Sequence, residues 1–234
     1  MKIASTAWKE TIVAGARELD IHVRPGQVDQ FARHASILKE WNQKINLTTI
    51  VDPLEMAIKH FLDAVLPCYY IQPASRILDV GSGAGFPGVA LKVMIPTLQV
   101  TLVEAKRKKV NFLKHVIREL GLTQIEAVQT RIENLNQHCR VKFDVIVSRA
   151  FSDLHQLIRL TLPYLAASGQ IIAYKAKVSA AEIRALRETI IDSISNQRVL
   201  PPGTDFQIKT LTFNLPVLNL PRTVLFLRCC CPRA

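Results

Sequence analysis

The sequence from Pro73 onward alternates short apolar runs with amphipathic segments of helical periodicity, and this alternation constrains the fold more than any other feature. Strands that alternate with helices form a parallel sheet. The last two apolar runs have no helix between them and the region carries prolines, so we expect an antiparallel hairpin at the sheet edge. The pattern predicts an α/β, Rossmann-like fold with a seven-stranded, mostly parallel sheet. The predicted strands span residues 76–80, 100–104, 125–128, 143–148, 171–175, 206–215 and 223–228.

Two of the intervening helices carry recognisable end signals. Gly121 follows a segment with one apolar face and is expected to end that helix in a left-handed conformation. Ser179, with Glu182 three residues later, forms a capping-box pattern that predicts the start of another helix.

The first 72 residues follow a different pattern. Apolar residues such as Phe31, Leu38 and Trp41 recur at three- to four-residue spacing, and Pro53 is placed to open a further helix. We therefore expect an N-terminal helical extension over residues 1–72 and a main domain over residues 73–234. A chain of 234 residues suits one such domain with a small appendage.

The composition indicates the cellular compartment in which the protein is expected. The first twenty residues mix basic and acidic side chains, and no stretch approaches the roughly 18 apolar residues of a membrane span, so we expect a cytoplasmic protein without a membrane segment. We also expect a monomer, although the sequence does not give the oligomeric state. Five cysteines, three of them adjacent at Cys229–Cys231, fit a reducing compartment. Consecutive cysteines point in different directions and no second Cys/His group follows at finger spacing, so we expect no metal site.

A glycine-dense turn follows the first predicted strand, in the segment Ile77–Gly88. Gly81, Gly83 and Gly85 allow the backbone to turn sharply and to approach a ligand closely. Glu104 ends the next predicted strand, where a carboxylate can accept hydrogen bonds from both ribose hydroxyls of an adenosine. The loop and Glu104 together predict a nucleoside-binding crevice.

Two cofactors fit such a crevice, because Gly83–Gly88 also satisfies the dinucleotide pattern G-x-G-x-x-G. That short match alone is weak. Asp79 precedes the first glycine, and its negative charge would repel a pyrophosphate but attract the ammonium group of S-adenosylmethionine (SAM). The sequence therefore favours SAM over a nicotinamide dinucleotide.

The charge balance predicts a polyanionic partner. The formal net charge is +11 and the isoelectric point is about 9.7, and basic side chains that meet phosphates release condensed counterions. A basic first helical turn opposes the helix dipole, so we expect the run that follows Glu104 to contact RNA phosphates, with a plain solvated face as the alternative. This run consists of Lys106, Arg107, Lys108 and Lys109.

At this level of detail the chain resembles the ribosomal RNA small subunit methyltransferase G family of SAM-dependent enzymes. The loop with its Phe-Pro-Gly ending and the tetrapeptide Ser-Arg-Ala-Phe are more specific than a general SAM signature. The resemblance implies methyl transfer to N7 of one guanine in 16S rRNA, either as naked RNA or within the small ribosomal subunit. The motifs that carry it are Trp41-Asn42, Asn46–Thr48, His60–Asp63, Asp79–Gly88, Lys108-Lys109 and Ser148–Phe151.

The resemblance also implies site residues. It places SAM contacts at Gly81 and Phe86, at Ile132 and Glu133, and at Arg149, and it keeps the ribose role of Glu104 although the family often has aspartate there. Arg149 and Lys175 are candidates for positioning the substrate, although Ala176 stands where the family tends to have glycine. The complete predicted cofactor-binding set is Asp79, Gly81, Gly83, Gly85, Phe86, Glu104, Ile132, Glu133 and Arg149.

The implied chemistry needs alignment more than proton transfer, because guanine N7 already carries an exposed lone pair. Arg149 is predicted at a strand end, where its fork can hold the SAM carboxylate, the guanine O6 or a surface carboxylate. Phe151 fits either a stacked base or the core. His60 and Asp63 lie one helical turn apart and form either a buried hydrogen-bonded pair or a substrate contact.

Three other functions remain open from the sequence. The chain can be a SAM methyltransferase that modifies another RNA base or a protein, a basic RNA-binding module that has lost catalysis, or a nicotinamide oxidoreductase.

Overall fold

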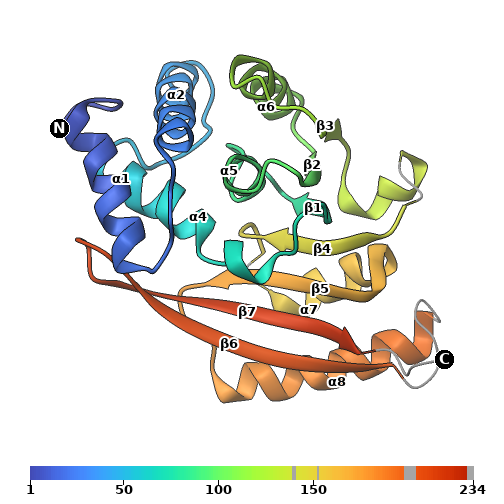
Figure 1. The fold of residues 1–234 in the computed structure, drawn as a ribbon. Helices are drawn as coiled ribbons and strands as arrows, with labels where there is room; N and C mark the ends of the chain where they lie inside the picture. Colours follow the sequence, from blue (N-terminus) through green and yellow to red (C-terminus); the bar gives the residue numbers. More distant parts are fainter. Residues whose placement is uncertain (139–140, 152, 198–203, 231–234) are drawn as a thin grey trace.

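A computed structural model describes residues 1–138, 141–151, 153–197 and 204–230. Its centre is a seven-stranded sheet of order β3-β2-β1-β4-β5-β7-β6 (Figure 1). Neighbours among the first five strands pair in parallel, and β7 pairs antiparallel with both β5 and β6. This confirms the predicted mostly parallel sheet and the edge hairpin. The strands are β1 (Arg76–Val80), β2 (Gln99–Glu104), β3 (Ile125–Gln129), β4 (Phe143–Ser148), β5 (Leu165–Lys175), β6 (Asp205–Leu215) and β7 (Leu220–Cys230).

Two predicted strands were too short by more than one residue: β7 extends beyond both ends of the predicted 223–228, and β5 starts well before the predicted 171. β5 begins at Leu165, six residues before the predicted start, because its first part is not a continuous apolar run. Ser168 is exposed there, Gly169 follows, and the pairing with β4 shifts register between Phe143 and Val145. An irregular strand start of this kind carries no alternating signal in the sequence.

Helices cover both faces of the sheet, with α5 and α6 on one side and α7 and α8 on the other (Figure 1). Alternate strand residues point to opposite faces, so that Ile77 joins the core beneath α5 and α6 whereas Leu78 joins the core beneath α7 and α8. The helices are α1 (Thr6–Glu18), α2 (Pro25–Asn42), α3 (Pro53–Met56), α4 (Asp63–Val65), α5 (Gly88–Met94), α6 (Arg107–Glu119), α7 (Leu154–Thr161) and α8 (Ala180–Gln197), with the short π- or 3₁₀-helical turns η1 (Ala57–Leu62), η2 (Cys68–Tyr70), η3 (Ile132–Gln137) and η4 (Leu162–Tyr164).

The helix-end predictions are confirmed. Gly121 has φ +61° just after α6, and its N–H donates to Arg118 O. Ser179 Oγ accepts from Glu182 N, while a Glu182 carboxylate oxygen accepts from Ser179 N, so both halves of the capping box form. Pro53 opens α3 behind an Asp52 cap.

The N-terminal helices pack onto the face that α5 and α6 cover. Trp8, Phe31 and Phe61 are buried in the same apolar cluster as Val89 and Phe112. The extension thus shares its core with the sheet, and the domain boundary at residue 73 stays a prediction. Among the described residues, no helix combines the length and the apolar character needed to cross a lipid bilayer.

The cysteine tail ends the last strand. Cys229 is buried and Cys230 is exposed, as expected for neighbours on a strand. Cys231 lies outside the described residues, and the absence of a metal site in this tail stays a prediction.

Candidate functional site

A cavity of about 240 Å³ opens at the carboxyl edge of β1, β2 and β4. Open α/β sheets bind their ligands at this edge. Four residues predicted to bind a cofactor line the cavity, although they come from three separate segments. These four are Gly81, Glu104, Ile132 and Glu133, and Val80, Val103, Ala105, Thr130, Arg131, Ala150, Phe151, Gln156 and Leu160 complete the lining.

The loop after β1 takes a conformation that requires its glycines. Gly81, Gly83 and Gly85 have φ values of +74°, +54° and +88°, which side chains with a Cβ rarely adopt. A Cβ on Gly81 would also lie 2.6 Å from the Cβ of Ala150. Any side chain at residue 81 would therefore displace the segment that follows β4.

Glu104 holds this loop in place. Its Oε2 accepts a hydrogen bond from Gly83 N at 3.2 Å, and its Oε1 accepts one from Lys106 N at 2.9 Å. The carboxylate is largely buried and also lines the cavity. Each carboxylate oxygen has a second lone pair, so this residue can anchor the loop and still accept a hydrogen bond from a ribose.

Asp79 lies beneath the loop and is fully buried. Its Oδ2 accepts a hydrogen bond from Gly88 N at 2.9 Å, whereas its Oδ1 has no hydrogen-bond partner. Burial raises the pKa of this carboxyl from 3.8 to about 7. Asp79 is not among the residues that line the cavity, and its predicted contact with a cofactor stays a prediction.

Phe86 is held between two histidines. Its ring stacks on His34 with a centroid distance of 4.9 Å and on His60 with a centroid distance of 4.7 Å. His34 Nε2 lies 3.0 Å from Ala84 O, which ties α2 to the loop. Because Phe86 is buried within this stack, its ring fixes the loop against the N-terminal helices, and a contact between the ring and a cofactor stays a prediction.

The tetrapeptide Ser148–Phe151 begins at the last residue of β4, and its residues make different contacts. Ser148 Oγ donates to Val80 O at 2.9 Å and so joins the ends of β4 and β1. Ala150 packs against Gly81, and Phe151 is half-buried and lines the cavity.

The guanidinium of Arg149 points away from the cavity lining, toward the N-terminal extension. It lies 3.3 Å from Asp63 Oδ2 and donates to Lys59 O at 2.9 Å. Arg222, from β7, meets the other oxygen of Asp63 at 2.8 Å. These contacts favour a structural ion pair over a cofactor contact for Arg149, and its predicted roles with SAM or guanine are not tested by this arrangement.

The pairing considered for His60 and Asp63 is replaced by other partners. His60 Nε2 lies 2.9 Å from Thr48 Oγ1, while Asp63 pairs with two arginines. Both residues belong to one continuous helix whose middle part, η1, is a π-helix. Such widened turns are frequent near functional sites.

Lys108 and Lys109, two of the four basic residues after Glu104, reach different places around the first turn of α6. Lys109 Nζ lies 4.0 Å from the position that a Cβ on Gly83 would take, beside the loop. Lys108 instead lines a separate cavity together with Trp41. Within the described part of the chain, no member of the run forms a salt bridge. Lys175 ends β5 at the same sheet edge, paired in register with Thr223.

Two residues of this arrangement were missed from the sequence. His34 and Arg222 reach the site from α2 and β7, and their partners lie far away along the chain. A single buried histidine in a helical pattern carries no signal of its partner, and neither does an arginine that follows a proline in a hairpin.

Comparison with known proteins identifies relatives of this chain. Residues 27–203 match the family described as GidB, rRNA small subunit methyltransferase G. Ribosomal RNA small subunit methyltransferase G of Geotalea uraniireducens (strain Rf4) is 41% identical over 184 residues, which cover 79% of this chain and 84% of the relative. The protein of the same name from Alkaliphilus oremlandii (strain OhILAs) is 36% identical over 215 residues, which cover 90% of each chain.

Solved structures share the fold at low sequence identity. A methyltransferase from Pyrococcus furiosus superposes with a TM-score of 0.57 at 13% identity and covers 86% of this chain and 98% of its own. A predicted O-methyltransferase from Agrobacterium tumefaciens superposes with a TM-score of 0.51 at 16% identity, covering 72% of this chain and 79% of its own. These likenesses confirm a Rossmann-like methyltransferase fold.

Proposed function

The chain belongs to the rRNA small subunit methyltransferase G family, and we propose that it transfers a methyl group from SAM to N7 of a guanine in 16S rRNA. The observation that carries this proposal is the cavity at the carboxyl edge of the sheet, which Glu104, Ile132 and Glu133 line together with the glycine loop. The proposal places the protein in the cytoplasm as a monomer, with naked 16S rRNA or the small ribosomal subunit as its partner.

The residues present fit a SAM molecule. The cavity is smaller than the roughly 300–1,000 Å³ of pockets that enclose a whole drug-sized ligand, so it suits the adenosine part of the cofactor. There Glu104 would accept from the ribose, and Ile132 and Glu133 would border the adenine. The partnerless Oδ1 of Asp79 would attract the ammonium group of the methionine part.

The chemistry of a bound SAM is to offer an electrophilic methyl group. Guanine N7 needs no proton removed before it reacts, so the protein contributes alignment, which can supply roughly 7 to 11 kcal/mol of a barrier. The Glu104 carboxylate and the left-handed glycines fix the loop that would hold the cofactor. Phe151 lies at the cavity, where its ring can stack on the target base.

Binding of RNA is assigned to the basic turn that begins α6. Lys109 lies beside the glycine loop, so phosphates held by Lys106, Arg107, Lys108 and Lys109 would lie next to the crevice. Replacing Lys108 and Lys109 by glutamine should flatten the salt dependence of RNA binding. An unchanged slope would remove these residues from the RNA contact.

The cofactor assignment is tested by calorimetric titration with SAM. We expect binding by the natural protein. For Asp79→Asn we expect an affinity at least tenfold weaker, because the negative charge that attracts the ammonium group is gone. The matched control is Asp192→Asn, the same change at an exposed position on α8. A protein that ignores SAM but binds NADH would instead be a nicotinamide enzyme.

The acceptor is tested by transfer of a tritiated methyl group to undermethylated small subunits and to naked 16S rRNA, followed by mapping of the modified base. Label at N7 of a guanine supports the proposal. Label on an exocyclic nitrogen, on a carbon or on protein would overturn the acceptor. SAM binding without transfer to any substrate would favour an RNA-binding module that has lost catalysis.

A further inference from the structure

We propose that the cavity between the end of α2 and the first turns of α6 binds one unpaired base of the RNA substrate, stacked on Trp41. This inference rests on the proposed RNA substrate and adds a second binding site outside the cofactor crevice. The cavity measures about 380 Å³, and Glu40, Trp41, Lys44, Ile45, Lys108 and Asn111 line it.

Trp41 forms a fixed apolar wall of this cavity. The indole is half-buried and packs against Phe112 at a centroid distance of 5.7 Å and against His115 at 5.2 Å. Ile45 is also half-buried and packs against the same core. An aromatic ring that is packed against its neighbours and lines a cavity can act as a stacking platform, because every base presents a π-face to it.

The charges at the rim fit a nucleotide. Lys44 and Lys108 are exposed and come from two different segments. Across the described residues, neither of them nor Glu40 takes part in a salt bridge. Two unpaired ammonium groups can contact the phosphates on either side of a base, while the Glu40 carboxylate can accept a hydrogen bond from a base N–H.

The position of the cavity connects it to the cofactor crevice. Lys108 lines the cavity, and its neighbour Lys109 lies beside Gly83 of the loop. Ala105, just before α6, lines the cofactor crevice. The start of α6 therefore lies between the two sites, so a single RNA strand can place its target guanine at the crevice and another base on Trp41.

The test uses the two tryptophans of the chain as reporter and internal control. Trp8 is fully buried, and its indole N–H donates to Pro53 O, so RNA cannot stack on it. We would titrate the full-length protein with a 12-nucleotide single-stranded RNA of mixed sequence and follow tryptophan fluorescence. Quenching is expected for the natural protein and none for Trp41→Phe, which retains only Trp8.

Affinity gives an independent readout. Trp41→Ala should raise the Kd for this RNA about tenfold, whereas Trp41→Phe, which can still stack, should recover most of the loss. A backbone of the same length without bases should bind the natural protein and Trp41→Ala equally. Lys44→Gln should reduce the slope of log K against log salt by about 0.7.

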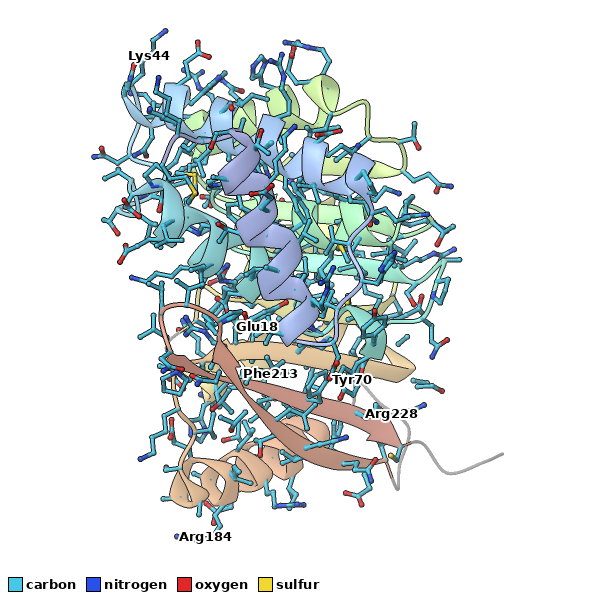
Figure 2. The ribbon with its side chains drawn as sticks, turned by 60° about the vertical axis from the view of Figure 1, so that its left-hand side comes forward. Glu18, Lys44, Tyr70, Arg184, Phe213 and Arg228 are labelled. Carbon is cyan, nitrogen blue, oxygen red and sulfur yellow. The ribbon has the colours of Figure 1, made fainter. Side chains whose placement is uncertain are left out.

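A matched control tests whether position matters as well as charge. Arg184→Gln removes one exposed positive charge from α8, at the opposite end of the molecule from Lys44 (Figure 2), and should leave the slope unchanged. Equal quenching in the natural protein and Trp41→Phe, or natural affinity in Trp41→Ala, would overturn the inference. Methyl transfer by a natural protein whose Trp41 does not respond would overturn the stacking site alone and leave the proposed function intact.

Discussion

Asp79 is a buried carboxyl group whose ionisation should reduce the stability of the folded protein. It is fully buried, with one backbone donor to one of its two oxygens. Burial raises its pKa to about 7, well above the 3.8 expected in an unfolded chain. Between about pH 4 and pH 7 the folded protein therefore keeps a proton on Asp79 that the unfolded chain has already released. The favourable contribution of this group is complete below about pH 4 and disappears as the pH rises through 7.

Replacement of Asp79 should remove this pH dependence. For the natural protein we expect the group to lower the free energy of unfolding by about 2 to 3 kcal/mol between pH 5 and pH 8. Asp79→Asn keeps an acceptor for Gly88 N but cannot ionise, so its loss over the same range should be smaller by that amount. Urea unfolding at the two pH values measures the difference. Identical losses in both proteins would show that Asp79 is ionised in the folded state.

Three elements meet at the aromatic stack around Phe86, which links α2, the glycine loop and η1. Burial lowers the pKa of His34 to about 4, and burial together with the charge of Arg149 lowers the pKa of His60 to about 3. Both imidazoles are therefore neutral in the folded protein above those values. Their contribution to stability is present above about pH 6.5 and is lost as the pH falls toward 4 and 3.

Acid should loosen this junction before it protonates exposed carboxylates. We expect the two histidines to lower the free energy of unfolding by about 2 to 5 kcal/mol between pH 7 and pH 4.5. His34→Phe keeps a ring in the stack but does not titrate, and it should remove roughly half of that loss. His22→Gln changes an exposed histidine and should leave the loss unchanged. If His34→Phe and the natural protein lose stability equally, His34 is not buried in its neutral form.

The elements differ in how well the sequence predicts them. Both ends of β1 and β4 are predicted correctly, since each is a short, mostly apolar segment that ends at a polar residue or just before a glycine. The start of β5 is missed because its polar residues hide the strand. The π-helical turn η1 was not predicted either.

The residues of the candidate site also differ in how well the sequence predicts them. Gly81 and Glu104 are predictable because their roles follow from strand ends and a glycine turn, which are local features. The direction of the Arg149 guanidinium toward the extension is not predictable, since it depends on Asp63 in the extension, which also pairs with Arg222 in the last strand. Pairing between residues that are far apart in sequence is set by the packed fold and leaves no pattern in a single sequence.

At the scale of the whole molecule, Asp63 connects three regions that the sequence separates. It belongs to the N-terminal extension, Arg149 follows β4 in the sheet, and Arg222 lies on β7 of the edge hairpin. The Asp63 side chain is 1% exposed, and burial raises its pKa while the two arginines oppose that rise. Removal of one partner leaves a buried carboxylate with less compensation, which is costly.

Arg222→Gln should therefore destabilise the protein by about 2 kcal/mol or more. Arg228→Gln, the same change at an exposed position on the same strand (Figure 2), should cost less than about 0.5 kcal/mol. Adding Asp63→Asn to Arg222→Gln should restore part of the loss, because the uncompensated charge is then gone. Denaturant unfolding of the natural protein, Asp63→Asn, Arg222→Gln and the double variant measures the coupling between the two sites. Additive losses in the double variant would mean that Asp63 and Arg222 do not interact.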